Sequence, residues 1–157
     1  MSQAIINTAK SVRQLVIRQV QAIPEELFDV QPQPFSNTIR WNVGHIVSCL
    51  DFFLSLGFPF DSNLPETYNS LFKPGTRPSD WTDTPPTKEE LIQYLSAQLE
   101  SLSDVSPSTL DKSLKSPIEM GPLRFETVGE VFNFAFIHET MHSSTISCLL
   151  KVNQYKE

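Results

Sequence analysis

Apolar residues recur every three or four positions in four separate stretches of the chain, which is the spacing of one face of an α-helix. The first stretch covers about Gln3 to Ile23 and stops at Pro24, because proline has no N–H for the helical hydrogen bonds. The second covers about Ile39 to Leu56, and Gly57 is typical of the position just past a helix end. The pattern therefore predicts two helices in the first part of the chain.

Two further helices are predicted from the residues that would start them. Thr87 and Thr127 are each followed three positions later by a glutamate, and this spacing forms a capping box at a helix N-terminus. The third helix would begin after Thr87, and the fourth would run from Thr127 to about Val152. The third carries a leucine stripe at Leu91, Leu95, Leu99 and Leu102.

The connection between the second and third helices is long, about 30 residues rich in Pro, Asp, Ser and Asn. It is too long for a tight turn between antiparallel helices, and one long crossover would let these two helices run parallel. We therefore expect an all-α four-helix bundle formed by one domain, residues 1–157. A short extended segment around Leu123–Phe125 is the one departure from helix that we expect before the fourth helix.

Charge and composition narrow the functional classes. The formal charge of −6 argues against nucleic-acid binding, which requires a basic surface. No apolar stretch approaches the roughly 20 residues that span a bilayer, and the first residues do not resemble a signal peptide. Cys49 and Cys148 lie in helical patterns without a disulfide or CxxC spacing, so we expect free thiols in the cytoplasm.

Three histidines are the candidate functional residues of this chain. His138 and His142 lie four residues apart, on one face of the fourth predicted helix, and His45 lies in the apolar stripe of the second. All three occupy positions where the pattern predicts core. Each could be a core histidine bonded to a carbonyl or a tyrosine. A shared metal ion satisfies all three at once, and three imidazoles leave a fourth coordination position open for a substrate.

The segment His138–His142 also fits H-E-x-x-H, the zinc-protease signature in which the glutamate is the general base. The extended signature requires Gly and His where this chain has Thr145 and Cys148. Glu139 is rotated about 100° from the two histidines around the helix. We expect it to be a solvated or inter-helix carboxylate, with a general-base role as the minority interpretation. The histidine seam is expected to include Val131, Phe134, Ala135, Met141, Ile146 and Leu149.

Trp41-Asn42-Val43-Gly44-His45-Ile46 and His138-Glu139-Thr140-Met141-His142 together resemble the motifs of the DinB-like superfamily. The resemblance implies an up-down-down-up bundle, often a homodimer, that binds Zn or Ni through residues matching His45, His138 and His142. It also implies a low-molecular-weight thiol as co-substrate, as in bacillithiol and mycothiol S-transferases, while other relatives resemble hydrolases. Many relatives continue after the last histidine with a small residue and Gly-Gln, whereas this chain has Ser143-Ser144-Thr145.

Three functions therefore stay open: a thiol S-transferase acting on small electrophiles, a metal-dependent hydrolase, and a non-catalytic metal-binding bundle of a stress response. Cys49 could be a fourth metal ligand, although a buried inert thiol is the commoner case. Arg40 and Arg124 could hold an acidic substrate, although solvated surface arginines are commoner. The aromatic residues are expected in the core, namely Trp41, Phe132, Phe134 and Phe136.

Overall fold

A computed structural model describes residues 1–58 and 63–155 of the chain, which are mostly helical. Four long helices confirm the four predicted stretches. They are α1 (Ser2–Ala22), α2 (Ile39–Gly57), α4 (Lys88–Ser101) and α6 (Val128–Gln154). Both predicted capping boxes are present, with Thr87 and Thr127 each accepting a hydrogen bond from the backbone of the glutamate three residues later. Gly57 is the last residue of α2 rather than the residue after it.

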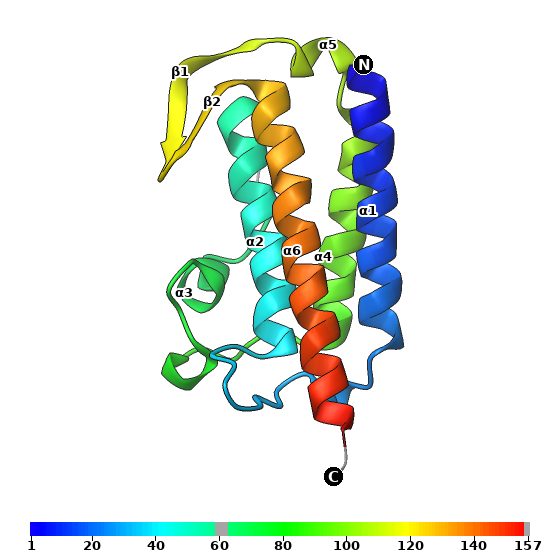
Figure 1. Ribbon diagram of the computed structural model, residues 1–157, viewed down its shortest axis with the longest axis vertical. Coiled ribbons are helices and arrows are strands. Elements are labelled where there is room, and N and C mark those ends of the chain that lie inside the picture. The colour runs from blue at the N-terminus through cyan, green and yellow to red at the C-terminus, as the bar shows by residue number, and fades with distance from the viewer. Residues whose placement is uncertain (59–62, 156–157) are drawn as a thin grey trace.

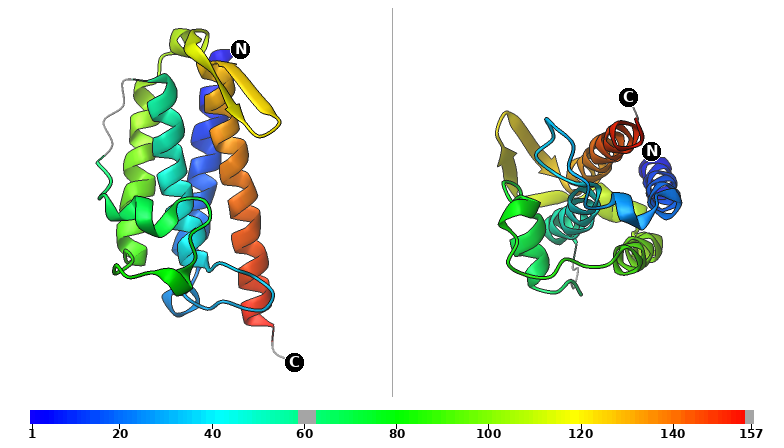
Figure 2. Two further views of the ribbon diagram at one scale, coloured as in Figure 1. Left: turned by 90° about the vertical axis from the view of Figure 1, so that its left-hand side faces the viewer. Right: turned by 90° about the horizontal axis from the view of Figure 1, so that it is seen from below.

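The four long helices lie side by side as a bundle (Figure 1, Figure 2). Helix α2 packs against α6 and α4, and α1 packs against the same two helices from the other side. In Figure 1 the colour gradient runs downward along α1 and α6 and upward along α2 and α4. Helices α2 and α4 therefore run parallel, which agrees with a long crossover between them.

The crossover carries the short helix α3 (Thr67–Phe72) and the 3₁₀ turn η2 (Pro78–Asp80), and α3 lies outside the bundle against α2 (Figure 1). Gly44 of α2 makes this packing possible. A Cβ atom at Gly44 would lie 2.4 Å from the Phe72 ring, so any larger residue would push α3 away. The Phe72 ring fills this space and is fully buried.

A β-hairpin corrects the all-α prediction. Strands β1 (Ser113–Met120) and β2 (Leu123–Thr127) pair antiparallel, with Ile118 opposite Phe125, and Gly121 adopts a left-handed φ of 60° in the turn. The expected extended segment at 123–125 lies within β2. The remaining short elements are the 3₁₀ turns η1 (Glu25–Leu27) and η3 (Leu102–Asp104) and the helix α5 (Pro107–Leu110).

The core contains most of the predicted apolar positions but not all of them. Met141 is 62% exposed, so its expected place in the histidine seam is wrong. Phe132 and Phe136 are buried, whereas Phe134 is only partly buried. None of the described helices is both long enough and apolar enough to cross a membrane.

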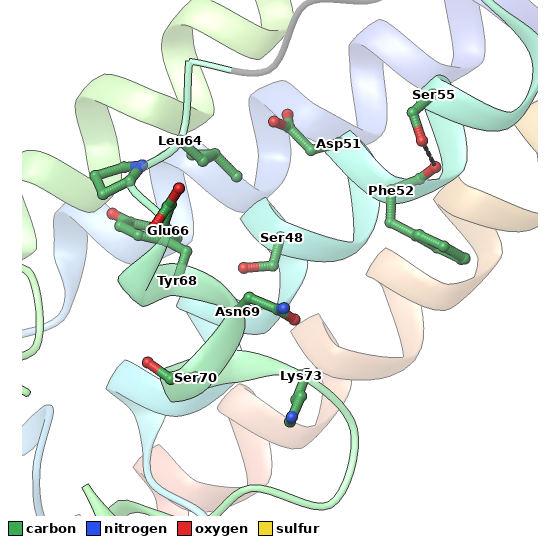
Figure 3. A pocket seen from close by; sticks show the side chains of 11 residues that line it. Ser48, Asp51, Phe52, Ser55, Leu64, Glu66, Tyr68, Asn69, Ser70 and Lys73 are labelled. Atoms are coloured by element: carbon green, nitrogen blue, oxygen red, sulfur yellow. Dashed lines mark hydrogen bonds between the residues drawn. The ribbon is translucent and has the colours of Figure 1, made fainter. Parts of the chain in front are cut away.

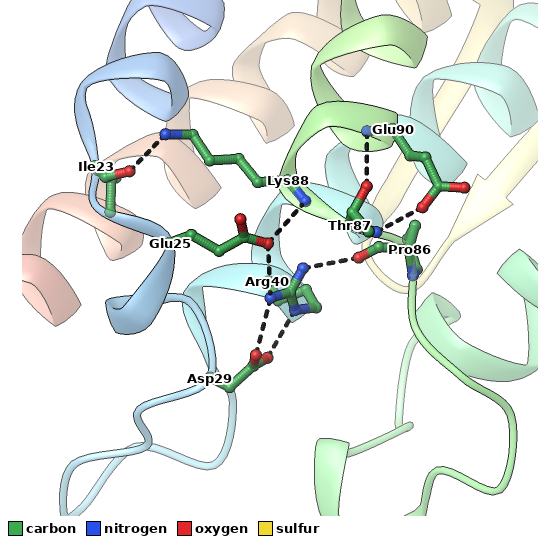
Figure 4. A network of polar contacts seen from close by, with 8 residues as sticks. All are labelled: Ile23, Glu25, Asp29, Arg40, Pro86, Thr87, Lys88 and Glu90. Carbon is green, nitrogen blue, oxygen red and sulfur yellow. Dashed lines mark hydrogen bonds and ion pairs between the residues drawn. The ribbon is translucent and has the colours of Figure 1, made fainter.

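Arg40 is a structural residue, which corrects both interpretations made from the sequence. Its side chain is buried and donates two hydrogen bonds to Asp29, at 2.7 and 2.8 Å, and a third to the Pro86 carbonyl oxygen (Figure 4). Glu25 lies on the same guanidinium at 3.7 Å and also contacts the backbone N–H of Lys88. Arg40 therefore joins α2 to the segments that precede α2 and α4. Arg124 is exposed and pairs with glutamates of the hairpin.

Candidate metal centre

His45, His138 and His142 converge between α2 and α6, and their ligand atoms all lie within 4.8 Å of one another. The Nε2 atoms of His45 and His138 are 3.3 Å apart. The His142 ring centroid lies 4.5 Å from that of His45 and 4.6 Å from that of His138. His45 is buried, and the other two are partly buried. The predicted convergence of the three rings is therefore confirmed, on the flank of the bundle that faces α3.

The orientation of the His45 ring follows from its contact with α3. Its Nδ1–H donates a hydrogen bond to the Phe72 carbonyl oxygen, at 2.6 Å. A carbonyl oxygen can only accept, so Nδ1 must carry the proton in neutral imidazole. The lone pair then lies on Nε2, which is the nitrogen that faces His138. Trp41 stacks on the His45 ring, with centroids 4.5 Å apart and planes 14° from parallel.

The orientation of the His142 ring follows from Asn42, one helical turn before His45. The His142 Nδ1–H donates to the Asn42 side-chain oxygen, at 2.8 Å. The Asn42 amide nitrogen donates to the Thr38 carbonyl oxygen, also at 2.8 Å, which settles which way the amide faces. Thr38 is the N-cap of α2. A chain of contacts from the start of α2 thus directs the lone pair of His142 toward its two neighbours.

Burial keeps the three rings neutral. Desolvation lowers the pKa of His45, against the opposing effect of its bond to Phe72. Desolvation, with repulsion from His45, lowers the pKa of His138 to about 4. The pKa of His142 falls to about 3 through desolvation and repulsion from the other two rings. At neutral pH all three imidazoles are therefore in the neutral form, which has a free nitrogen lone pair that binds metals.

The family model described as the DinB superfamily matches residues 9–146, a range that includes all three histidines. The chain belongs to the DinB superfamily. No curated protein matches it. The family assignment predicted from the two histidine motifs is therefore confirmed.

Glu139 of this DinB protein faces away from the histidines. Its side chain is only 2% exposed and accepts a hydrogen bond from Arg13 at 2.9 Å, in the centre of the bundle. Arg13 also donates to Gln98, at 2.7 Å, and Gln98 donates to Asp51, at 2.6 Å. Each of the four long helices contributes one residue to this buried network. The prediction of a solvated carboxylate at Glu139 is therefore wrong, and the alternative prediction of an inter-helix carboxylate is confirmed. The role of Arg13 was not predicted from the sequence.

Cys49 lies beside the cluster without joining it. Its Sγ is 3.4 Å from Nε2 of His45. Among the described residues, however, the group of ligand atoms that all lie within 4.8 Å of one another consists of the three histidines and does not include Cys49. Burial raises the pKa of the Cys49 thiol to about 12, so it is a neutral thiol. Both cysteines are free, as predicted, and Cys148 is exposed.

A pocket of about 350 Å³ opens beside the histidines of the DinB site, and both His138 and Cys49 line it. A second pocket of about 660 Å³ lies between α2 and α3 and is more polar, with Asp51 and Glu66 among its lining residues (Figure 3). The two pockets share the side chains of Ser48, Phe52, Asn69 and Lys73. The cluster thus borders a cavity of a size typical of small-molecule sites.

Proposed function

We propose that His45, His138 and His142 bind one divalent metal ion, Zn or Ni. The donor set fits this ion. Two nitrogens bound to one zinc at about 2.0–2.1 Å in a tetrahedral arrangement lie roughly 3.3 Å apart. The separation between Nε2 of His45 and Nε2 of His138 in the structure is 3.3 Å. Hydrogen bonds from Nδ1 to a carbonyl or amide oxygen, as at His45 and His142, are the usual support of ligating histidines.

We further propose that the protein is a metal-dependent S-transferase that joins a low-molecular-weight thiol to a small electrophile. The overall reaction converts a thiol and R–X into a thioether and HX. A metal ion held by three neutral imidazoles would supply Lewis acidity that lowers the pKa of a bound thiol. The protein's own contribution is to orient the three rings through Phe72 and Asn42 and to offer the adjacent pocket to the second substrate.

The observation that favours a transferase over a hydrolase is the position of Glu139. In H-E-x-x-H hydrolases the glutamate activates water, so it must face the metal. Here its carboxylate is bound to Arg13 on the other side of α6. A thiol, whose pKa lies closer to neutral than that of water, needs no such base. A hydrolase and a non-catalytic metal-binding bundle of a stress response are the two alternatives.

The domain organisation, the oligomeric state and the cellular compartment are further parts of the proposal. We propose that residues 1–157 act as one DinB-type domain, that two copies form a homodimer, and that the protein works in the cytoplasm. Two free cysteines are in keeping with a reducing compartment. Size-exclusion chromatography with light scattering tests the dimer.

Elemental analysis of the purified protein tests the metal, and a screen of metal-loaded protein against thiols and electrophiles tests the activity. We expect one equivalent of Zn or Ni, and turnover that requires both metal and thiol. Turnover with water alone would favour the hydrolase. Full metal content without turnover for any thiol would favour the non-catalytic bundle. A failure to bind any divalent metal would overturn the site itself.

A further inference from the structure

The pocket beside the histidines has mostly apolar walls that come from three elements. Phe53 of α2 and Phe134 of α6 meet edge to face, with ring centroids 5.5 Å apart, and both rings lie beside His138. Met120, at the end of β1, closes the side formed by the hairpin. Such walls favour an apolar, flat ligand, since aromatic rings bind other rings by edge and face contacts.

Lys73 gives the same pocket a positive charge at its rim. Lys73 is the one lysine, arginine, aspartate or glutamate among the described residues that line this pocket, and the acidic Asp51 and Glu66 do not line it. Figure 3 shows Lys73 near Asn69, and both residues line the two pockets. Within residues 1–58 and 63–155 Lys73 forms no ion pair. A cation without an ion-pair partner in that part of the chain, in a protein of net charge −6, is suited to an anionic group of a ligand.

Ser48 adds a polar group between the apolar walls and this rim. Its hydroxyl oxygen is buried and has no hydrogen-bond partner among the described residues, although Ser48 lines both pockets. A buried hydroxyl without a partner costs free energy, which a ligand atom that can accept or donate a hydrogen bond would recover. Polar recognition is therefore concentrated at the end of the pocket formed by α2 and α3.

We propose that this pocket binds the electrophilic co-substrate of the S-transferase and that this co-substrate is a small aromatic acid. Its ring would lie against Phe53 and Phe134, with the reactive carbon toward His138 and the anionic group toward Lys73. That the ligand is a co-substrate rests on the proposed S-transferase function. The binding of an aromatic anion is a property of the pocket itself and can be tested separately from catalysis.

Two fluorescent probes with the same aromatic body separate the apolar and the charged contributions. They are 8-anilino-1-naphthalenesulfonate, which is anionic, and N-phenyl-1-naphthylamine, which is neutral. We expect both to bind metal-loaded protein saturably with one site. Lys73→Gln should weaken the anionic probe about three- to fivefold, as expected for an exposed ion pair, and leave the neutral probe unchanged. Phe134→Ala should weaken both probes about tenfold through lost apolar contact.

Lys151→Gln, which removes an exposed lysine at the far end of α6, is the matched control and should change neither probe. Met120→Ala replaces Phe134→Ala if that variant does not fold. Equal weakening of both probes by Lys73→Gln, no weakening by either wall variant, or no saturable binding would overturn the proposal. Metal content is measured on every sample. Probe binding without metal binding would overturn the proposed function and leave the aromatic-anion pocket intact.

Discussion

Arg13 and Glu139 form an ion pair of 2.9 Å in the centre of the bundle, where their side chains are 0% and 2% exposed. The pair joins α1 to α6, and Gln98 extends it to α4 and, through Asp51, to α2. Glu139 follows His138 directly in sequence. The same stretch of α6 therefore serves the core on one face and the histidine cluster on another.

Replacing Glu139 should destabilise the fold without removing the metal. Glu139→Gln leaves the buried Arg13 guanidinium without its charged partner, which costs about 3 kcal/mol of unfolding free energy. The histidines keep their own contacts, so each folded molecule should still bind one equivalent of metal. Urea unfolding and elemental analysis measure the two effects.

Glu100→Gln, at an exposed position of α4, is the matched control and should change the unfolding free energy by less than about 0.5 kcal/mol. Loss of metal from folded Glu139→Gln would contradict the separation of core and site. A stability equal to that of the parent would show that the ion pair carries little of the fold's free energy.

Each histidine should be required for metal binding and dispensable for folding. His142→Ala removes one of three nitrogens and the bond to Asn42, so stoichiometric metal binding should be lost. Most of the neighbouring core is apolar and remains, so the helical circular-dichroism spectrum should be unchanged. His138→Ala and His45→Ala should behave alike. Full metal content in any one of the three variants would exclude that histidine as a ligand.

Asn42 is a positioning residue whose removal should weaken metal binding without abolishing it. Asn42→Ala frees the His142 ring to rotate and to take the other tautomer, and loss of such a supporting contact typically costs about 10–100-fold in metal affinity. Competition with a chelator of known affinity measures this change. Asn133→Ala, at an exposed position of the same helix as His142, should have no effect. An Asn42→Ala affinity within about twofold of the parent would refute the role.

Local patterns could predict the helices and the histidines, because helical periodicity, capping boxes and the four-residue spacing are all properties of short segments. The contacts that explain the site are not local. Asn42 and His142 are 100 positions apart, and Arg13 and Glu139 are 126 apart. Arg13 lies in the apolar stripe of α1 between Ala9 and Val16, and this position was the available signal of its burial. Its partner Glu139 could not be predicted from that local pattern.

The predictions for the hairpin and for Arg40 failed for related reasons. Strand β1 has partly buried apolar residues at alternate positions, Leu114, Ile118 and Met120, but Ser116 interrupts this series and none of its residues is fully buried. So weak an alternation does not mark a half-buried strand clearly. Arg40 is buried only because Asp29 and the Pro86 carbonyl, 11 and 46 positions away, satisfy its donors.

Asn42 lies within the motif that carried the family resemblance. Its position one turn before His45 was the available signal for its role.

Metal-free protein should lose stability as the pH falls below about 6.5. In the folded state the pKa values of His138 and His142 are about 4 and about 3, whereas a histidine in the unfolded chain titrates near 6.5. Between these values the unfolded chain binds more protons, so stability is complete above about pH 6.5 and declines as the pH falls toward 4. The melting temperature of chelator-treated protein should therefore decrease from pH 7 to pH 5.

His142→Leu removes one of these groups and should show a shallower decrease. Burial raises the pKa of Glu139, which acts with the opposite sign, and Glu139 is present in both proteins and cancels in the comparison. Identical pH slopes for the two proteins would show that His142 is not buried as a neutral ring.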